Sequence, residues 1–159
     1  MPPRMLIDTN VWLDYFIDRS KNHDVAVELI VKAIESGAEL AVPIACVKDC
    51  FFLLMAELKR IERQEAGVLG DSAVLAIREV AWACISAMRK LAYVVPADEA
   101  DMLQALAMRS EHPDFEDNLV IAAAMRVRAD YLVTSDVQLL KHATFPCISP
   151  AAAFDVLAN

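Results

Sequence analysis

The stretch Met5-Leu6-Ile7-Asp8-Thr9-Asn10-Val11-Trp12 begins with three apolar residues and then changes abruptly to polar ones. A short, wholly apolar run of this kind is typical of a strand that is buried on both faces of a sheet. Asp and Thr commonly stand at the beginning of a helix. The sequence therefore predicts a strand over 5–7, followed by a helix that begins near Thr9.

The same alternation of short apolar runs and longer helical runs continues along the chain. Further strands are expected at 40–42, 91–95, 131–134 and 146–148, and further helices at 24–36, 44–63, 72–90, 97–109, 115–128, 137–141 and from 150. Asp71 or Ser72 is expected to cap the helix that ends near Lys90. This order predicts a three-layer α/β/α fold with a short, mostly parallel five-stranded sheet. A length of 159 residues fits one domain over 1–159.

The composition excludes several classes of protein. With 57% hydrophobic residues and three glycines, the chain is neither disordered nor collagenous. A formal net charge of −8 argues against a broad basic DNA-binding face, but a local site with a bound cation could still take nucleic acid. The apolar runs are too short for a membrane helix, and the N-terminus lacks a signal peptide, so a cytoplasmic protein is expected. The four cysteines lack the spacing of zinc ligands.

Four acidic residues from separate segments are expected to meet at one edge of the sheet. Right-handed crossovers bring the carboxyl ends of parallel strands to the same edge, where such folds bind their ligands. The acidic residues that follow strands or begin helices there are Asp8, Asp49, Asp117 and Asp136. Carboxylates that are held together repel one another, and a hard cation such as Mg²⁺ or Mn²⁺ removes that repulsion. The pattern therefore favours a divalent metal site.

Helix capping is the competing interpretation for most of these acids. Asp8 and Asp136 each precede a predicted helix, and Asp114 with Asp117 has the spacing of a capping box. Asp49 differs because it lies inside a very apolar helix, where an ionised side chain is costly unless it is paired or faces solvent beside Lys48.

Two parts of the chain resemble the PIN domain family. Residues 5–14 are similar to the opening of that domain, and residues 117–124 followed by 129–136 are similar to its closing signature. The resemblance spans essentially the whole chain and implies a PIN-like fold and a Mg²⁺- or Mn²⁺-dependent ribonuclease. Small bacterial members are often the VapC-type toxin of a toxin–antitoxin pair. The family's metal-binding acids correspond to Asp8, Asp49, Asp117 and Asp136, although the second acid is commonly Glu in the family.

Further residues are expected to support this chemistry. A metal held by the acids would bind the scissile phosphate and lower the pKa of a bound water molecule. Polar neighbours of the acids are expected to orient the carboxylates or water molecules, unless they only cap helices; they are Thr9, Asn10, Thr134 and Ser135. Arg60 and Arg63, with Lys59, could contact RNA, as could Arg126 with Arg128; solvated helix faces have the same composition.

Other functions and partners remain open from the sequence. A phosphohydrolase of another Asp-based α/β family would normally need a second acid where Asn10 stands, and a PIN-like protein could serve only as a binding or assembly partner. The helix at 44–63 is apolar almost all round. It predicts a homodimer through this helix and its neighbour, with an apolar groove for an antitoxin segment, unless the helix is buried within the monomer.

Overall fold

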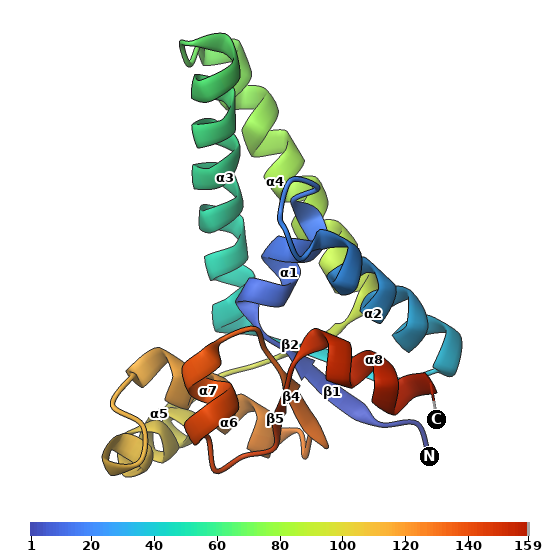
Figure 1. Cartoon of the computed structure of the whole chain (residues 1–159). Helices are drawn as coiled ribbons and strands as arrows, with labels where there is room; N and C mark the ends of the chain where they lie inside the picture. The colour runs from blue at the N-terminus through green and yellow to red at the C-terminus, as the bar shows by residue number, and fades with distance from the viewer. Residues whose placement is uncertain (159) are drawn as a thin grey trace.

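The computed structural model describes residues 1–158 (Figure 1). Its strands are β1 (Arg4–Ile7), β2 (Glu39–Pro43), β3 (Tyr93–Val95), β4 (Tyr131–Val133) and β5 (Cys147–Ile148). Its helices are α1 (Thr9–Phe16), α2 (His23–Ser36), α3 (Ile44–Ala66), α4 (Asp71–Leu91), α5 (Glu99–Ala107), α6 (Phe115–Arg126), α7 (Val137–His142) and α8 (Pro150–Ala158), with a 3₁₀ turn η1 (Met108–Ser110) after α5. The alternation expected from the sequence is confirmed, with ends that shift by a few residues.

All neighbouring strands of the sheet are parallel, in the order β3-β2-β1-β4-β5. Leu6 of β1 lies between Ala41 of β2 and Leu132 of β4. The chain builds outward from β1 to β3 and then continues on the other side of β1 with β4 and β5. The strand order therefore reverses between β1 and β4, and ligands of open α/β sheets bind at the carboxyl ends of such strands.

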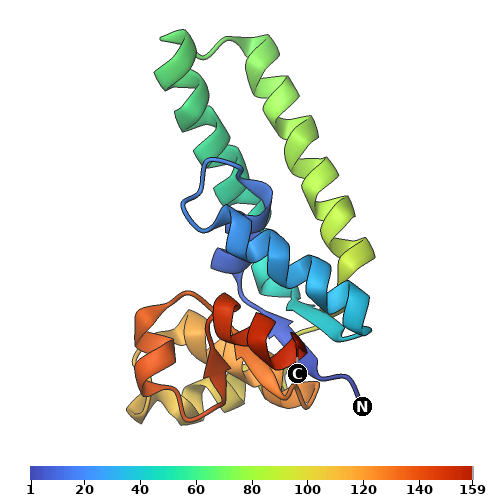
Figure 2. The ribbon, with the colours of Figure 1, turned by 45° about the vertical axis from the view of Figure 1, so that its right-hand side comes forward.

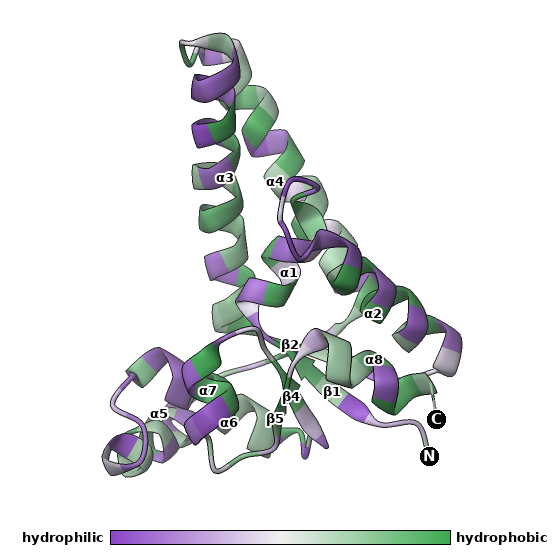
Figure 3. Cartoon of the chain, in the orientation of Figure 1, coloured by the Kyte–Doolittle hydropathy of each residue, from purple (hydrophilic) through white to green (hydrophobic). Residues whose placement is uncertain are grey.

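Helices cover the sheet on two sides and complete the expected three layers. In Figures 1 and 2, α1, α2 and α8 lie together on one side, and α5 and α6 lie on the other. The strands are hydrophobic along most of their length (Figure 3), as burial on both faces requires. Leu6, Ile30, Ile121 and Leu132 are all completely or almost completely buried, and so is the indole of Trp12. The core is thus centred on β1 and β4.

Helices α3 and α4 form a long hairpin that projects from the body of the molecule (Figures 1 and 2). The half of α3 near the sheet is mainly hydrophobic and its far half mainly hydrophilic (Figure 3). The helix ends at Gly67, whose φ of +75° lies in the region that favours glycine. Phe52 and Trp82 remain largely exposed on this hairpin, so α4 covers only part of the apolar surface of α3. No helix within residues 1–158 is long and apolar enough to cross a membrane.

The beginning of α4 differs from the sequence-based expectation. Asp71 is already the first helical residue, and Gly70 occupies the capping position without a side-chain hydrogen bond. The prediction that Asp71 or Ser72 caps the helix was wrong. The negative charge of Asp71 still lies in the first turn, where it interacts favourably with the helix dipole.

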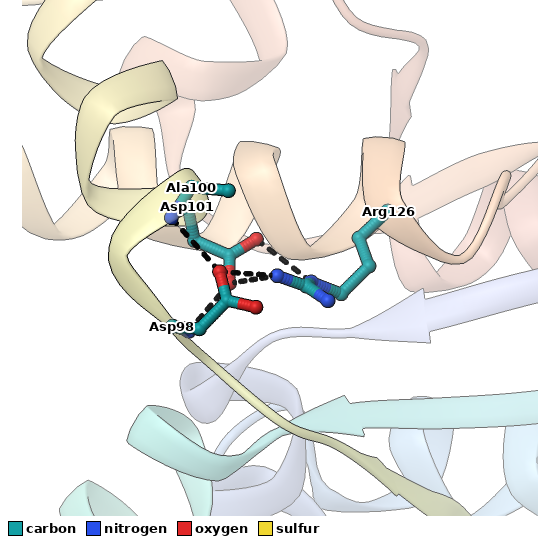
Figure 4. A network of polar contacts seen from close by, with 4 residues as sticks. All are labelled: Asp98, Ala100, Asp101 and Arg126. Carbon is teal, nitrogen blue, oxygen red and sulfur yellow. Dashed lines mark hydrogen bonds and ion pairs between the residues drawn. The ribbon is translucent and has the colours of Figure 1, made fainter.

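A capping box at the start of α5 is joined to the end of α6 by an arginine (Figure 4). The Asp98 side chain accepts a hydrogen bond from the Ala100 amide at 2.8 Å, and the Asp101 carboxylate accepts one from the Asp98 amide at 2.8 Å. Arg126 donates to both oxygens of Asp101, at 2.9 and 2.8 Å, and pairs with Asp98 at 2.6 Å. These contacts lower the pKa of both carboxyl groups. Arg126 thus has a structural partner and is not a free cation for RNA.

Asp101→Asn is expected to lower the melting temperature at neutral pH by a few degrees, because it removes the charge from a buried bidentate pair. The arginine holds the pKa of Asp101 below its usual value, so this stabilisation exists above the usual pKa and is lost as the pH falls through the folded-state pKa. The difference between variant and wild type should therefore shrink in acid. Arg89 is exposed and forms no ion pair within residues 1–158, so the control variant Arg89→Gln should leave the melting temperature almost unchanged. Thermal melts of both variants and the wild type over a pH series provide the comparison.

Candidate functional site

Asp8 lies at the point where the strand order reverses. It follows β1 directly, and its amide donates to the Val133 carbonyl of β4 at 3.0 Å. Its side chain caps α1 by accepting a hydrogen bond from the Thr9 amide at 2.7 Å, so the capping interpretation is correct for this residue. The residue is only 7% exposed. A buried carboxylate therefore stands at the carboxyl edge of the two central strands.

A polar network between β1 and β4 holds this carboxylate. Thr134 donates its hydroxyl to Asp8 Oδ2 at 2.7 Å, and Asn10 Nδ2 donates to the same oxygen at 2.9 Å. Thr134 Oγ1 in turn accepts hydrogen bonds from Asn10 Nδ2 at 3.2 Å and from the Asp136 amide at 3.0 Å. Asn10 Oδ1 accepts from the Ser135 amide at 2.9 Å. Thr9 and Ser135 thus take part through their backbone, whereas Asn10 and Thr134 contact the Asp8 side chain itself.

Asp117 and Asp136 bring two further carboxylates to the same edge. Asp136 caps α7 by accepting hydrogen bonds from the Gln138 and Leu139 amides, and Asp117 lies in the first turn of α6, which Asp114 caps. Burial, followed by the charges of Asp114, Asp136 and Asp8, raises the pKa of Asp117 to about 6. Burial also raises the pKa of Asp8, and the charge of Asp136 adds to this effect.

These three carboxylates lack a basic partner. Within residues 1–158, no Lys or Arg forms an ion pair with Asp8, Asp117 or Asp136. Within this described part of the chain, no ion pair therefore offsets their mutual repulsion. An all-oxygen set of this kind suits a hard divalent ion.

Asp49 lies in a different environment from the other three acids. Its side chain, 19% exposed, pairs with Lys48 Nζ at 2.7 Å. It also forms a hydrogen bond with the carboxyl group of Glu116; burial and this contact raise the pKa of Glu116. The sequence left two alternatives for Asp49, an unpaired acid in the core or an acid that faces solvent beside Lys48. The structure shows a partly buried acid that pairs with Lys48 and connects α3 to the beginning of α6.

Glu116 was missed by the sequence analysis, although it directly precedes Asp117. The beginning of a helix commonly carries acidic residues for capping and for the helix dipole, so its position alone gives no functional signal. Cys46 was also not expected near the acids; its sulfur lies 4.0 Å from Asp8 Oδ1. Burial raises its pKa to about 12, so it is a neutral thiol there.

A cavity of about 320 Å³ opens beside the carboxylates. Its lining includes Asp117 and Asp136, and also His112 and His142, two residues that the sequence analysis did not assign to any site. A second cavity, of about 490 Å³, lies between the end of α1 and α3, and none of the four acids lines it. The smaller cavity is the one that can admit a ligand to the acids.

The structure does not bring all the predicted site residues together. Among residues 1–158, no three Asp, Glu, His or Cys side chains are close enough together to share one metal ion. Arg60 pairs with Glu57, and it lies roughly 16 Å along the helix axis from Asp49, with Arg63 roughly 21 Å away. These two arginines therefore belong to the projecting hairpin and not to the carboxylate edge.

Comparisons with solved structures give the same fold at low sequence identity. VapBC2 from Rickettsia felis, bound to a DNA fragment from its promoter, matches with a TM-score of 0.56 and 12% identity over 92% of this chain and 98% of that one. VapC20 from Mycobacterium tuberculosis, a Sarcin-Ricin loop cleaving toxin, has a TM-score of 0.58 and 16% identity over 89% and 95%. VapBC-1 from nontypeable Haemophilus influenzae has a TM-score of 0.57 and 13% identity over 92% and 98%.

No curated protein sequence shows a significant match to the chain. The family model for the PIN domain, in contrast, matches residues 4–138. This match includes four of the five strands and all four acids that were expected at the carboxyl edge. Because the match covers most of the sequence and agrees with the sheet topology, the chain belongs to the PIN domain family.

Proposed function

We propose that this protein is a Mg²⁺- or Mn²⁺-dependent ribonuclease and the toxin of a toxin–antitoxin pair. The observation that carries the proposal is the group formed by Asp8, Asp117 and Asp136 at the strand-order reversal, where the three carboxylates repel one another without a basic partner in residues 1–158. The similarity of fold to VapC20, a toxin that cleaves the Sarcin-Ricin loop, supports RNA as the substrate class.

The donor set fits a hard divalent cation. Asp8, Asp117 and Asp136, with Asp49 as the fourth acid, would hold Mg²⁺ or Mn²⁺ through carboxylate oxygens. The ion would bind the scissile phosphate and lower the pKa of a water molecule for in-line attack. Side-chain rotations must bring the acids closer together than they stand here, and within residues 1–158 no hydrogen bond restrains the Asp117 carboxylate.

The remaining residues have supporting roles in this proposal. Thr134 and Asn10 fix the orientation of Asp8 through their hydrogen bonds, which is how the neighbours of metal-binding carboxylates commonly act. Lys48 neutralises part of the charge of Asp49 and Glu116 at the rim. RNA would reach the acids through the cavity beside Asp117, and Arg60 and Arg63 would contact more distant phosphates.

Protein partners are also part of the proposal. The structures from Rickettsia felis and Haemophilus influenzae are VapBC complexes, which supports an antitoxin as the partner of this chain. Exposed apolar side chains of the α3–α4 hairpin, among them Phe52, Leu53 and Trp82, offer a surface for an antitoxin segment. A homodimer remains the expected state of the chain without its antitoxin.

Millimolar Mn²⁺ is expected to raise the melting temperature of the metal-free protein by several degrees. An ion that binds only the folded state at about 100 times its dissociation constant adds about 2.7 kcal/mol to the free energy of unfolding. Differential scanning calorimetry with and without Mn²⁺ measures the shift, and an RNA-cleavage assay with and without EDTA tests activity on the same samples. A protein that neither gains stability from Mn²⁺ nor cleaves RNA would be a binding or assembly partner, and the ribonuclease proposal would be wrong.

A further inference from the structure

The cavity of about 320 Å³ beside the carboxylates is lined by more groups than a metal ion needs. Its walls are the segment that leads from η1 into α6 and the helix α7, which lies close to that segment in Figures 1 and 2. Thr144, just after α7, donates its hydroxyl to Glu111 Oε2 at 3.3 Å and so joins the two walls. Glu111, His112 and Gln138 line the cavity in addition to the acids of the sheet edge. Its volume lies within the range of ligand pockets, which begins at about 300 Å³.

His112 contributes a polar atom that lacks a partner. The residue is 6% exposed, and its Nε2 is buried without a hydrogen bond to any group of residues 1–158. Its backbone, in contrast, is held firmly: the amide donates to the Met108 carbonyl at 2.9 Å, and the carbonyl accepts from Asn118 Nδ2 at 2.8 Å. A buried polar atom without a partner destabilises the folded state, and a ligand in the cavity that offers a hydrogen-bonding group would remove this cost. Rotation of the ring about its Cβ–Cγ bond would turn Nε2 toward such a ligand.

The rest of the lining is rich in hydrogen-bond acceptors. Glu111 accepts one hydrogen bond, at Oε2, and its Oε1 has no partner within residues 1–158. The Gln138 side chain is exposed and forms no hydrogen bond to the described residues, so its amide can both donate and accept. These groups surround a space and do not converge on a point, since no three metal-binding side chains of residues 1–158 come together. Such a lining suits a planar organic group that presents N–H donors better than it suits a second ion.

We propose that this cavity is a subsite for a guanine base of an RNA strand. The Watson–Crick edge of guanine presents the O6 acceptor beside two adjacent donors, the N1–H and N2–H groups, and proteins read unstacked RNA bases on this edge. The Glu111 carboxylate would accept from both N–H groups, and His112 Nε2 would donate to O6. Pro113, which also lines the cavity, offers an apolar surface to the face of the base. The position of this base next to the scissile phosphate rests on the proposed ribonuclease function, because Asp117 and Asp136 line the same cavity.

Other ligands match this pair of residues less well. Adenine and cytosine present an amino group beside a ring-nitrogen acceptor, and that acceptor would face the carboxylate. Uracil presents one N–H between two carbonyl groups. An acceptor opposite the Glu111 carboxylate leaves both without a partner, which is strongly unfavourable. The guanidinium of an arginine from a protein partner has paired N–H donors, but it offers no acceptor to an N–H of His112.

Nuclear magnetic resonance titration of the labelled full chain with 5′-GMP, 5′-IMP, 5′-AMP, 5′-CMP and 5′-UMP in Mg²⁺ tests the subsite without cleavage. IMP lacks the N2 amino group, so GMP should bind at least about fivefold more tightly than IMP and than the other nucleotides. Glu111→Gln should abolish this preference, whereas Glu28→Gln, in an exposed glutamate of α2 without an ion pair in residues 1–158, should retain it. Equal affinities for all five nucleotides, or tighter binding of N-acetyl-arginine amide than of GMP, would overturn the proposal.

Two substitutions of His112 test the contact to O6. His112→Phe keeps a ring but removes Nε2, so the affinity for GMP should decrease about tenfold. His112→Gln retains an N–H donor and should keep most of the affinity. Circular dichroism and thermal melting establish that each variant is folded, and Glu111→Gln, at an exposed position, provides the test if His112→Phe is not. Wild-type affinity in a folded His112→Phe variant would contradict the assignment of His112.

Cleavage assays separate this proposal from the proposed function. Single-stranded RNAs that contain one guanosine should be cut next to it, and replacement of that guanosine by inosine should slow cleavage at least about fivefold. Cleavage that is indifferent to the base would overturn the subsite and leave the ribonuclease function intact. Selective binding of GMP by a protein that cleaves no RNA would support the subsite and contradict the ribonuclease function.

Discussion

Asp117→Asn is expected to lower Mn²⁺-dependent RNA cleavage by at least about a hundredfold. The change preserves the shape of the side chain but removes a negative oxygen from the group of repelling carboxylates. Since a metal contributes several kcal/mol of transition-state stabilisation, and each 1.36 kcal/mol is a factor of ten in rate, the loss of one ligand should be readily measured. Single-turnover cleavage of a labelled RNA over a range of Mn²⁺ concentrations separates weaker ion binding from slower chemistry.

The same variant should be more stable than the wild type in metal-free buffer at neutral pH. The pKa of Asp117 is raised to about 6 in the folded protein, so ionisation of this group opposes folding. The wild type should lose stability as the pH rises from 3.8, the usual pKa of an aspartate, to about 6, the pKa of Asp117 in the folded protein. Asp117→Asn should not show this loss. Melting curves in EDTA over this range of pH provide the measurement.

Asp114→Asn is the matched control, because it removes a nearby negative charge from the same helix end. Asn caps helices about as well as Asp, so this variant should keep the α6 cap and most of the activity. Equal losses of activity in Asp114→Asn and Asp117→Asn would show that charge in general, and not a ligand at position 117, is required. Full activity in Asp117→Asn would contradict the proposed site.

The sequence predicted the order of the elements because its strands are short and apolar. Met5-Leu6-Ile7 and Leu132-Val133 are buried between helices on both sides, and Tyr131 is partly buried, so each strand gives an uninterrupted apolar run between polar residues. The beginning of α4 was not predicted correctly. Gly70 has no side chain to cap the helix, and both Asp71 and Ser72 are residues that commonly do so, so local preference favoured the wrong residue.

The sheet topology was enough to predict which edge of the sheet carries the acids. It was not enough to predict the contacts that the acids make with one another. Parallel strands place Asp8 and Thr134 at the same edge, and this needs only the strand assignment. The hydrogen bond between Asp49 and Glu116 depends on the angle at which α3 leaves β2 relative to α6, which no local pattern specifies. The cavity beside the acids was likewise not visible in the sequence, because its lining joins the segment before α6 to the distant helix α7.

Thr134→Val is expected to lower the free energy of unfolding by about 2–4 kcal/mol and the melting temperature by roughly 6–12 °C. Thr134 is completely buried, and its hydroxyl donates to Asp8 while accepting from Asn10 and from the Asp136 amide. Valine has nearly the same shape, so it leaves the packing intact but removes all three contacts. The partly buried Asp136 amide and the buried Asp8 carboxylate oxygen then each lose a partner, and each such loss costs about 1–3 kcal/mol.

RNA cleavage should also decrease in Thr134→Val, because the change affects the protonation of Asp8. The hydrogen bond from Thr134 lowers the pKa of Asp8, which burial raises, so its removal favours the protonated form that cannot bind a cation. Mn²⁺ affinity measured by calorimetry should therefore decrease in Thr134→Val and decrease more steeply as the pH falls. Thr134→Ser retains the hydroxyl and should keep most of the affinity and of the activity. If Thr134→Ser, which retains the hydroxyl, reduced Mn²⁺ affinity as much as Thr134→Val, loss of the hydroxyl could not be the cause, and the proposed role of its hydrogen bonds in positioning Asp8 would be wrong.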